Sequence, residues 1–346
     1  MKQAVIFCAM FLLLLLGGCQ KQGEVPASTE REKEDSVQIG LSCDTFVLER
    51  WIRDRDVFVS TAGAMGAEVN VQNANGDKEK QVSQIEYLME KGMDVIVIVA
   101  IDTSDPGLLE AEQKAQREGI KVIAYDRLIQ SAGVDLYLSV DSEKVGELMA
   151  EAVLEKIPGD GKIAAILGSP TDANVALLED GITEVLNEHG QELVYLNYAD
   201  GWKAEYGYEY TEECLEEQGR IDALICGNDG LASFAFQSLA EHRLADHVVL
   251  VGQDADIEAC QRIVEGQQYM TVYKDLQTLA KQTAQCAVAM GRGEQIDAKE
   301  TVWDGSQNVP AFCLEPVAVT EENMEEEIID SQFHFRDEVY LHAESE

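Results

Sequence analysis

Short apolar runs alternate with longer amphipathic stretches from Val37 onward. The runs are rich in Val and Ile and end in glycine or polar residues, which is typical of buried β-strands. We predict strands at residues 37–43, 67–74, 94–100, 121–126, 162–168, 192–198, 221–228, 248–254 and 270–274. Between them, residues 79–92, 142–157 and 275–293 repeat their apolar positions with the period of an α-helix.

This alternation is typical of a doubly wound α/β fold, in which helices cover both faces of a mostly parallel sheet. A single sheet of about ten strands is wide for such a fold. We therefore predict two sheets and two lobes. Ligands of these folds bind outside the carboxyl ends of the strands, so the residues that follow each strand are the first candidates for a site.

Those residues are carboxylates, amides, basic groups and tryptophans. The candidates are Arg50, Trp51, Asp126, Arg127, Asp172, Asn174, Trp202, Asn228, Asp254 and Lys274. Taken singly, an Asp or Asn at such a position is more often a helix cap or a loop residue. Their recurrence after one strand after another favours a binding site.

This mixture of side chains suits a sugar. Hydroxyl groups both donate and accept hydrogen bonds, so Asp can accept from them, Arg and Lys can donate, and Asn can do both. The apolar C–H face of a sugar ring packs on a flat aromatic ring. We expect Trp51 to offer such a surface and Arg50 to place fixed donors beside it, whereas Arg53 and Arg55 are predicted to lie in ion pairs on an exposed helix face.

The first residues, "MKQAVIFCAMFLLLLLGGCQ", read as a signal peptide at 1–18, with Lys2 before an apolar run at 4–16 that is short for a bilayer. The ending "LGGC" resembles the lipobox of bacterial lipoproteins, which predicts lipidation of Cys19. A plain secretory signal with an incidental cysteine is the alternative. Residues 19–36 are polar and predict a flexible tether, which makes the protein extracytoplasmic and membrane-bound through its lipid only.

The net charge of the chain argues against some classes of binding partner. The chain has 65 acidic and 26 basic residues and a formal net charge of -39. Nucleic acid and anionic lipid surfaces require clustered Lys and Arg, so neither is an expected partner. A neutral or cationic ligand fits better, although the acidity also serves solubility alone.

Enzymatic and metal motifs are missing from the sequence. There is no GxGxxG, P-loop, HExxH or nucleophile elbow, and the five histidines form no evident set. The cysteines after Cys19 lack CxxC or metal-like spacing, so we predict no metal and no cofactor, and we assign no disulfide. We expect a binding protein and not an enzyme, although carboxylates in a cleft can serve as acid and base.

Several long motifs resemble a known family. They include "LERWIRDRDVF", "EGIKVIAYDRLI", "GSPTDANVALL", "DGW", "VGQDADIEACQRIVEGQQYMTVYK" and "NVPAF", in order from about Val37 to Pro316. In these motifs the chain resembles the type I periplasmic binding proteins of bacterial sugar ABC transporters, and among them the D-xylose-binding proteins. The resemblance implies that the candidate residues above contact the sugar, with Trp51 and Trp202 as the stacking aromatics.

The resemblance also implies two Rossmann-like lobes joined by three crossing segments near Val140, near Tyr273 and near Val309. The N-terminal lobe is expected to hold residues 37–140 and 275–308, the C-terminal lobe 141–274 and 309–335, and an acidic tail 336–346. Cys43 and Thr45 depart from the family pattern at positions that we expect at the rim of the cleft.

Transport follows from the resemblance: a monomer that captures D-xylose or a close monosaccharide and delivers it to a membrane ABC permease. A sugar-sensing co-receptor for a membrane histidine kinase needs the same pocket, so this alternative stays open. A sugar-responsive repressor of the same fold requires a DNA-binding module and a basic face, and the sequence has a signal peptide and a large negative charge instead.

Overall fold

A computed structural model describes residues 36–342, apart from the side chain of Glu49. The predicted signal peptide, the lipidation site Cys19 and almost all of the tether lie outside these residues, as do the last residues of the acidic tail.

A seven-stranded sheet in the order β11-β12-β5-β4-β3-β1-β2 forms the core of the first lobe. Its strands are β1 (Gln38–Cys43), β2 (Glu68–Asn73), β3 (Val95–Ile98), β4 (Lys121–Tyr125), β5 (Leu136–Val140), β11 (Glu300–Trp303) and β12 (Asn308–Leu314). All neighbours are parallel except β11, which runs antiparallel to β12 at the edge.

The second lobe contains a six-stranded sheet in the order β13-β10-β9-β8-β6-β7. Its strands are β6 (Ile163–Leu167), β7 (Leu193–Tyr198), β8 (Ala223–Cys226), β9 (Val249–Gln253), β10 (Met270–Tyr273) and β13 (Val317–Val319). Only β13 is antiparallel to its neighbour. The two α/β lobes confirm the predicted fold class.

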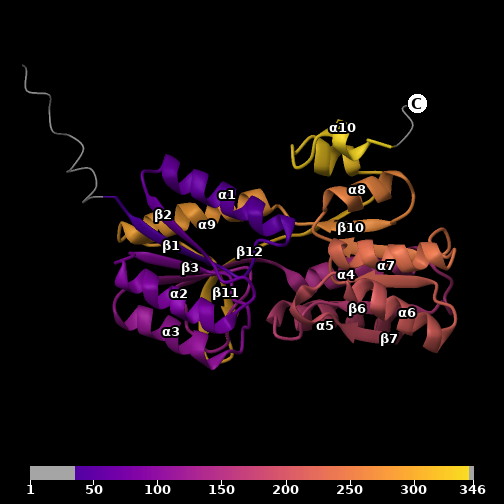
Figure 1. Ribbon diagram of the computed structural model, residues 1–346, viewed down its shortest axis with the longest axis horizontal. Coiled ribbons are helices and arrows are strands. Elements are labelled where there is room, and N and C mark those ends of the chain that lie inside the picture. Colours follow the sequence, from indigo (N-terminus) through magenta and orange to yellow (C-terminus); the bar gives the residue numbers. More distant parts are fainter. Residues whose placement is uncertain (1–35, 343–346) are drawn as a thin grey trace, which may run out of the picture. The chain divides into compact units, whose positions relative to one another are not determined.

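Helices cover both faces of each sheet (Figure 1). In the first lobe these are α1 (Glu49–Ala64) and α9 (Leu276–Gly291) on one side, with α2 (Lys78–Glu90) and α3 (Pro106–Arg117) on the other. In the second lobe α4 (Ser142–Lys156) packs on α5 (Ala173–Glu188), and α6 (Tyr206–Gln218) packs on α7 (Asp229–Glu241). Within residues 36–342, none of the helices is both long enough and apolar enough to cross a membrane.

The chain passes between the sheets at three points. It leaves the first sheet after Val140 at the end of β5, and it returns after Tyr273 at the end of β10. The third passage, which the resemblance placed near Val309, lies later, because β12 pairs with β5 as far as Leu314. Residues 309–314 therefore belong to the first sheet. Pro310, which cannot donate to a strand ladder, made this region a poor strand candidate.

Part of the predicted acidic tail packs against the second lobe. Helix α8 (Ile257–Val264) packs against α10 (Arg336–Val339), and Val339 is buried. Residues 336–339 are thus part of the second lobe and not of a free acidic tail, because Val339 joins an apolar cluster with Cys260, Tyr273 and Ile328.

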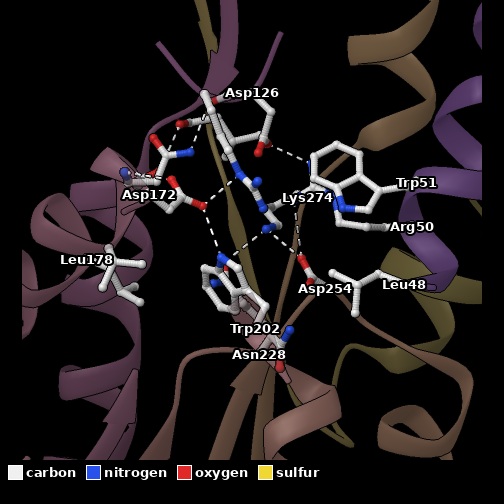
Figure 2. A pocket seen from close by; sticks show the side chains of 16 residues that line it. Leu48, Arg50, Trp51, Asp126, Asp172, Leu178, Trp202, Asn228, Asp254 and Lys274 are labelled. Atoms are coloured by element: carbon white, nitrogen blue, oxygen red, sulfur yellow. Dashed lines mark hydrogen bonds and ion pairs between the residues drawn. The ribbon is translucent and has the colours of Figure 1, made fainter. Parts of the chain in front are cut away.

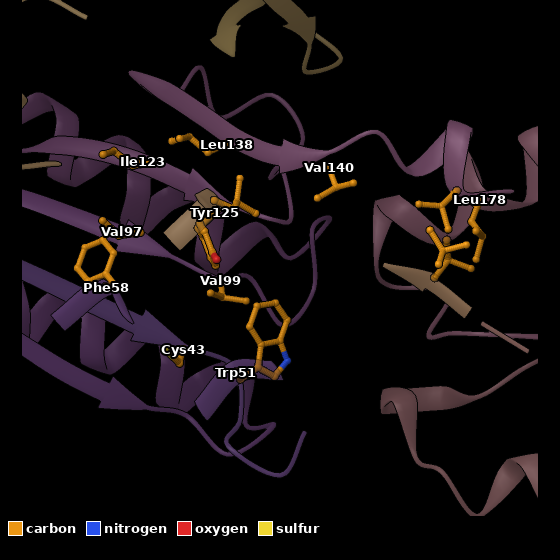
Figure 3. Packing of buried hydrophobic residues seen from close by; sticks show 14 of the residues in the cluster. Cys43, Trp51, Phe58, Val97, Val99, Ile123, Tyr125, Leu138, Val140 and Leu178 are labelled. Atoms are coloured by element: carbon orange, nitrogen blue, oxygen red, sulfur yellow. The ribbon is translucent and has the colours of Figure 1, made fainter. Parts of the chain in front are cut away.

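Apolar packing brings α1 close to the carboxyl ends of the strands. Figure 3 shows Trp51 beside Val99 and Tyr125, at the edge of a cluster that also holds Cys43 and Phe58. The cysteines of the described region are all unpaired, and every one of them except Cys313 is buried. The core therefore fixes the first turn of α1, which carries Arg50 and Trp51.

Candidate functional site

The ten candidate site residues all line one cavity at the carboxyl ends of the strands (Figure 2). The first lobe contributes Arg50 and Trp51 from α1, and Asp126 and Arg127 from the end of β4. The second lobe contributes the others from the loops after β6, β7, β8, β9 and β10. The cavity also includes residues that the sequence did not indicate, namely Leu48, Val140, Ser142, Val175, Leu178 and Gln253.

Among these additional residues, Gln253 had a signal in the sequence. It is the last residue of β9, directly before Asp254, and its side chain accepts a hydrogen bond from Lys274 Nζ at 3.0 Å. The apolar residues had no signal of their own, because a Leu or Val beside a cleft has the same pattern as one in the core.

Two of the cavity side chains also cap helices. The Asp172 carboxylate accepts from the backbone N–H of Asn174 at the start of α5, and Asn228 Oδ1 accepts from that of Leu231 at the start of α7. These two residues therefore cap helices and also line the cavity. Capping fixes each side chain at a helix N-terminus, where the backbone dipole favours electron-rich groups.

Left-handed backbone conformations occur at three cavity residues. The φ angle is 66° at Asp126, 57° at Trp202 and 100° at Asp254, which are uncommon values for residues other than glycine. Such conformations persist only where the surroundings enforce them, and they concentrate at functional sites.

Oppositely charged groups fill the centre of the cavity, and some of their contacts join the two lobes. Arg127 Nε lies 2.7 Å from Asp172 Oδ2 of the second lobe, while its Nη1 lies 2.8 Å from Asp44 Oδ2 of the first. Arg50 Nη2 lies 2.7 Å from Asp126 Oδ1, and its Nη1 lies 3.7 Å from Asp254 Oδ1 across the lobes. All six side chains have little exposure.

Further bonds complete this network. Lys274 Nζ lies 2.5 Å from Asp254 Oδ1 within the second lobe. Asn174 Nδ2 donates to the Asp126 carbonyl across the lobes, at 2.9 Å. The two lobes are therefore in contact, and candidate site residues make these contacts.

Burial and charge pairing oppose each other at these groups. Burial raises the pKa of Asp126, but Arg50, Lys274 and Arg127 outweigh it and hold the pKa below its ordinary value. At Asp172 burial dominates, so its pKa is raised although Arg127 is close. Burial lowers the pKa of Arg50, yet the carboxylates of Asp126 and Asp254 raise it overall, which keeps the guanidinium charged.

The two tryptophans lie against different partners. The Arg50 guanidinium carbon is 4.1 Å from the Trp51 ring centroid, and Trp51 is 3% exposed. Trp202 lies against Gly168, where a Cβ atom would come within 2.1 Å of the indole, and its Nε1 donates to Asp172 Oδ2 at 3.2 Å. A glycine at 168 thus makes room for the ring.

Two buried donors of the cavity have no hydrogen-bond acceptor among the described residues: Arg50 Nε and Trp51 Nε1. A buried donor without an acceptor is unfavourable, since it has lost its water. The cavity therefore offers unused donors beside carboxylates and amides that accept, next to two indole rings. These groups match a small ligand with several hydroxyls and apolar ring faces.

Three sequence expectations need correction. Neither Cys43 nor Thr45 lines the cavity: Cys43 is buried in a separate small hollow behind Trp51, and the Thr45 hydroxyl accepts from the backbone N–H of Val47. Arg53 is half-buried, and it donates to the carbonyl of Phe333 at 2.8 Å instead of lying on an open helix face. The sequence contains no signal for the contact between Arg53 and Phe333, because these residues lie far apart in the chain.

Comparison with known proteins agrees with this geometry. Residues 39–295 match the family described as periplasmic binding protein domain. The chain is 42% identical to the D-xylose-binding periplasmic protein of Haemophilus influenzae over 309 residues, which cover 88% of this chain and 92% of that protein. It is 39% identical to the D-xylose-binding periplasmic protein of Escherichia coli, over 88% of this chain and 92% of that protein.

A solved structure extends the comparison to the fold. An ABC transporter solute-binding protein from Clostridium phytofermentans, solved with bound β-D-glucose, is similar with a TM-score of 0.77 and 28% identity. The match covers 87% of this chain and 99% of that one.

Proposed function

Because the chain belongs to the periplasmic binding protein domain family, we propose that it captures D-xylose, or a closely related monosaccharide, between its two lobes and delivers it to a membrane ABC permease. The observation that carries the proposal is the cavity itself. It combines two indole rings, ion-paired carboxylates and guanidinium groups, and the unused donors Arg50 Nε and Trp51 Nε1. The names of the two D-xylose-binding relatives support the choice of sugar.

Binding is coupled to closure in this proposal. A sugar that contacts Asp126 and Arg127 of one lobe and Asp172 and Asp254 of the other binds best when the lobes are together, so it shifts the population to the closed form. The sugar hydroxyls replace part of the existing ion-pair and hydrogen-bond network. Closure removes water, which strengthens the remaining polar contacts.

The protein acts outside the cytoplasm in this proposal, held to the membrane by a lipid on Cys19 and the tether that follows. It works as a monomer without cofactor, and it releases its sugar unchanged. Asp126 supports this role, because Arg50, Lys274 and Arg127 hold its pKa below its ordinary value and so keep it an ionised acceptor for sugar hydroxyls.

Tryptophan fluorescence tests where the sugar binds. The sequence has three tryptophans, of which Trp51 and Trp202 line the cavity and Trp303 is 62% exposed. In a Trp303→Phe variant we expect D-xylose to change the emission in a saturable manner, with D-glucose, D-ribose and L-arabinose as competitors. Sugar binding detected by calorimetry without any change of emission would place the site elsewhere.

Uptake separates transport from sensing. In cells that lack this protein, uptake of labelled D-xylose at low concentration should fall and should return with the wild-type gene but not with an Asp254→Ala variant. Unchanged uptake together with a lost transcriptional response to D-xylose would favour the co-receptor for a histidine kinase.

A further inference from the structure

The loop that carries Asp254 is strained. After β9, the φ angles are 100° at Asp254 and 54° at Ala255, two consecutive residues in a region that normally favours glycine. Asp254 lines the cavity and pairs with Lys274 and Arg50. Its position therefore depends on whatever holds this backbone in place.

Three buried side chains bond to the backbone of this loop. The Ala255 N–H donates to Thr271 Oγ1 at 3.2 Å, and the Asp256 N–H donates to Asp229 Oδ2 at 3.1 Å. On the other side, His334 Nε2 donates to the Ala255 carbonyl at 2.8 Å. Thr271 and Asp229 belong to the body of the second lobe, whereas His334 belongs to the C-terminal segment.

The C-terminal segment, residues 320–340, is packed tightly enough to act as a support. Met324, Ile328, Phe333 and Val339 are buried in one cluster with Ala255. The Phe333 ring meets the ring of Tyr273 edge-on, with centroids 4.9 Å apart. His334 is 6% exposed, so its hydrogen bond to Ala255 is shielded from water.

The same segment touches the first lobe. Arg53 Nη1 donates to the Phe333 carbonyl at 2.8 Å, and the Arg53 guanidinium carbon is 4.1 Å from the Phe333 ring centroid. Arg53 lies on α1 one turn from Arg50, the residue that reaches Asp254 across the lobes. A small hollow lined by both lobes, with Arg50, Asp254, Phe333 and His334 among its walls, separates the segment from the cavity.

We propose that the C-terminal segment is a clamp for the binding site, with His334 as the positioning residue for Asp254 and Phe333 as the contact that fastens α1 of the opposite lobe. The clamp rests on the proposed function only in that the cavity is where sugar binds. The segment would thereby stabilise both the position of Asp254 and the contact between the two lobes, without touching the sugar.

Amide exchange tests the clamp without any sugar. In the full soluble chain, His334→Ala should speed hydrogen exchange of the Ala255 and Asp256 amides by about tenfold or more. His334→Gln, whose amide N–H can reach the same carbonyl, should leave it within about threefold. The control Val339→Ala removes buried atoms from the same segment but leaves the bond to Ala255, so it should not affect these two amides selectively.

Sugar affinity provides the second readout. We expect His334→Ala to weaken D-xylose binding by about tenfold in the wild-type background, but by less than threefold in an Asp254→Asn background, because the loop then no longer positions a carboxylate. Equal losses in both backgrounds, or unchanged exchange at Ala255 and Asp256, would overturn the positioning role of His334.

Arg53→Ala keeps the proposal testable if His334→Ala does not fold. Since Arg53 and Phe333 lie on opposite lobes, its loss should speed D-xylose dissociation several-fold and leave the association rate unchanged, whereas an unchanged dissociation rate counts against the clamp. If the wild-type chain binds none of the sugars, the proposed function fails, and the amide exchange still decides whether the clamp exists.

Discussion

At the scale of single residues, the charged groups of the cavity form ion pairs with one another. Arg127 is shared between Asp44 and Asp172, and Lys274 pairs with Asp254. A ligand hydroxyl therefore gains only the difference between its own bonds and those that it replaces. Removing one charged partner leaves the other buried and unpaired, so single substitutions should have large effects.

Replacing Asp254 by Ala tests this argument. The change leaves Lys274 and Arg50 without a carboxylate and takes an acceptor away from the ligand, so D-xylose affinity should fall by about 1.5 to 3 kcal/mol. Calorimetry measures the loss, and Glu258→Gln, an exposed acid on nearby α8, should bind as the wild type does. Undiminished affinity of Asp254→Ala would show that the cavity is not the sugar site.

A second prediction concerns Asp54, a buried carboxyl behind the cavity. Tyr125 donates to its Oδ2 at 2.9 Å, and Arg50 Nη2 lies 3.7 Å away. Burial raises the pKa of Asp54 to about 7, even though Arg50 and the Tyr125 hydroxyl lower it. An unfolded Asp titrates near about 3.9. Between these values the folded protein holds a proton that the unfolded chain has lost, so this contribution to the free energy of unfolding falls as pH rises.

Asp54→Asn removes that titration and keeps an oxygen for Tyr125. Relative to the wild type, the variant should become progressively more stable as pH rises from about 4 to about 7 and should gain little above that, as measured by urea denaturation at several pH values. Asp229, whose pKa burial also raises to about 7, is present in both proteins and cancels in the difference. A difference that does not change with pH would contradict a protonated Asp54.

The candidate residues could be predicted because each one follows a strand or belongs to a motif, and both properties are local. The ion pairs and hydrogen bonds that these residues form with one another could not be predicted. Arg127 bonds to Asp172 only because the lobes lie together, and Arg53 meets Phe333 although 280 positions separate them. Contacts of this kind depend on the position of one lobe relative to the other, for which the sequence has no local signal.

At the scale of elements, close helix packing places the residues of the second lobe. Helices α4 and α5 approach each other over glycines: a Cβ atom at Gly181 would lie 2.1 Å from the Glu143 carbonyl oxygen, and one at Gly146 would lie 2.1 Å from that of Leu178. Helix α5 begins at the Asp172 cap, so this contact also sets where Asp172 and Asn174 stand in the cavity.

Gly181→Ala should therefore push α4 and α5 apart. We expect a loss of about 1 to 3 kcal/mol in stability, as for other overpacked sites, together with weaker D-xylose binding. Gly63→Ala in α1 is the matched control, because its Cβ atom would meet nothing within 4 Å and should stabilise the helix by about 0.5 to 1 kcal/mol. Thermal unfolding compares the two, and equal behaviour would contradict a backbone clash at Gly181.

The strands and helices that the sequence predicted are those whose apolar residues form a clear run or repeat with a helical period. Most of the long apolar strands were visible as runs, but four strands were not predicted: β5, although it is fully buried, and β11, β12 and β13. In β12 the runs are broken by Pro310, and β11 and β13 are short and largely not buried. The third passage between the lobes, which the resemblance placed near Val309, lies after β12.

At the scale of the whole molecule, three chain passages join the sheets and the cavity residues meet between them. This construction allows the lobes to move apart about the passages, whereas bonds such as Arg127 to Asp172 hold them together. A ligand shifts the equilibrium between the open and closed forms, because it stabilises the form in which it contacts both lobes.

Small-angle scattering should report this balance. Without sugar a population of open molecules is expected, so saturating D-xylose should lower the radius of gyration of the soluble chain. An Arg127→Ala variant, which lacks the contact to Asp172, should have a larger radius without sugar than the wild type. A radius that neither the sugar nor this substitution changes would contradict binding coupled to closure.

The most direct test of the account is a calorimetric titration of the soluble chain, beginning after Cys19, with D-xylose. The account predicts saturable binding of one sugar per chain with micromolar or tighter affinity, about -8 kcal/mol or more favourable, and weaker binding of D-glucose, D-ribose and L-arabinose. Absence of binding, or equally weak binding of all four sugars, would contradict the assignment of this cavity to D-xylose.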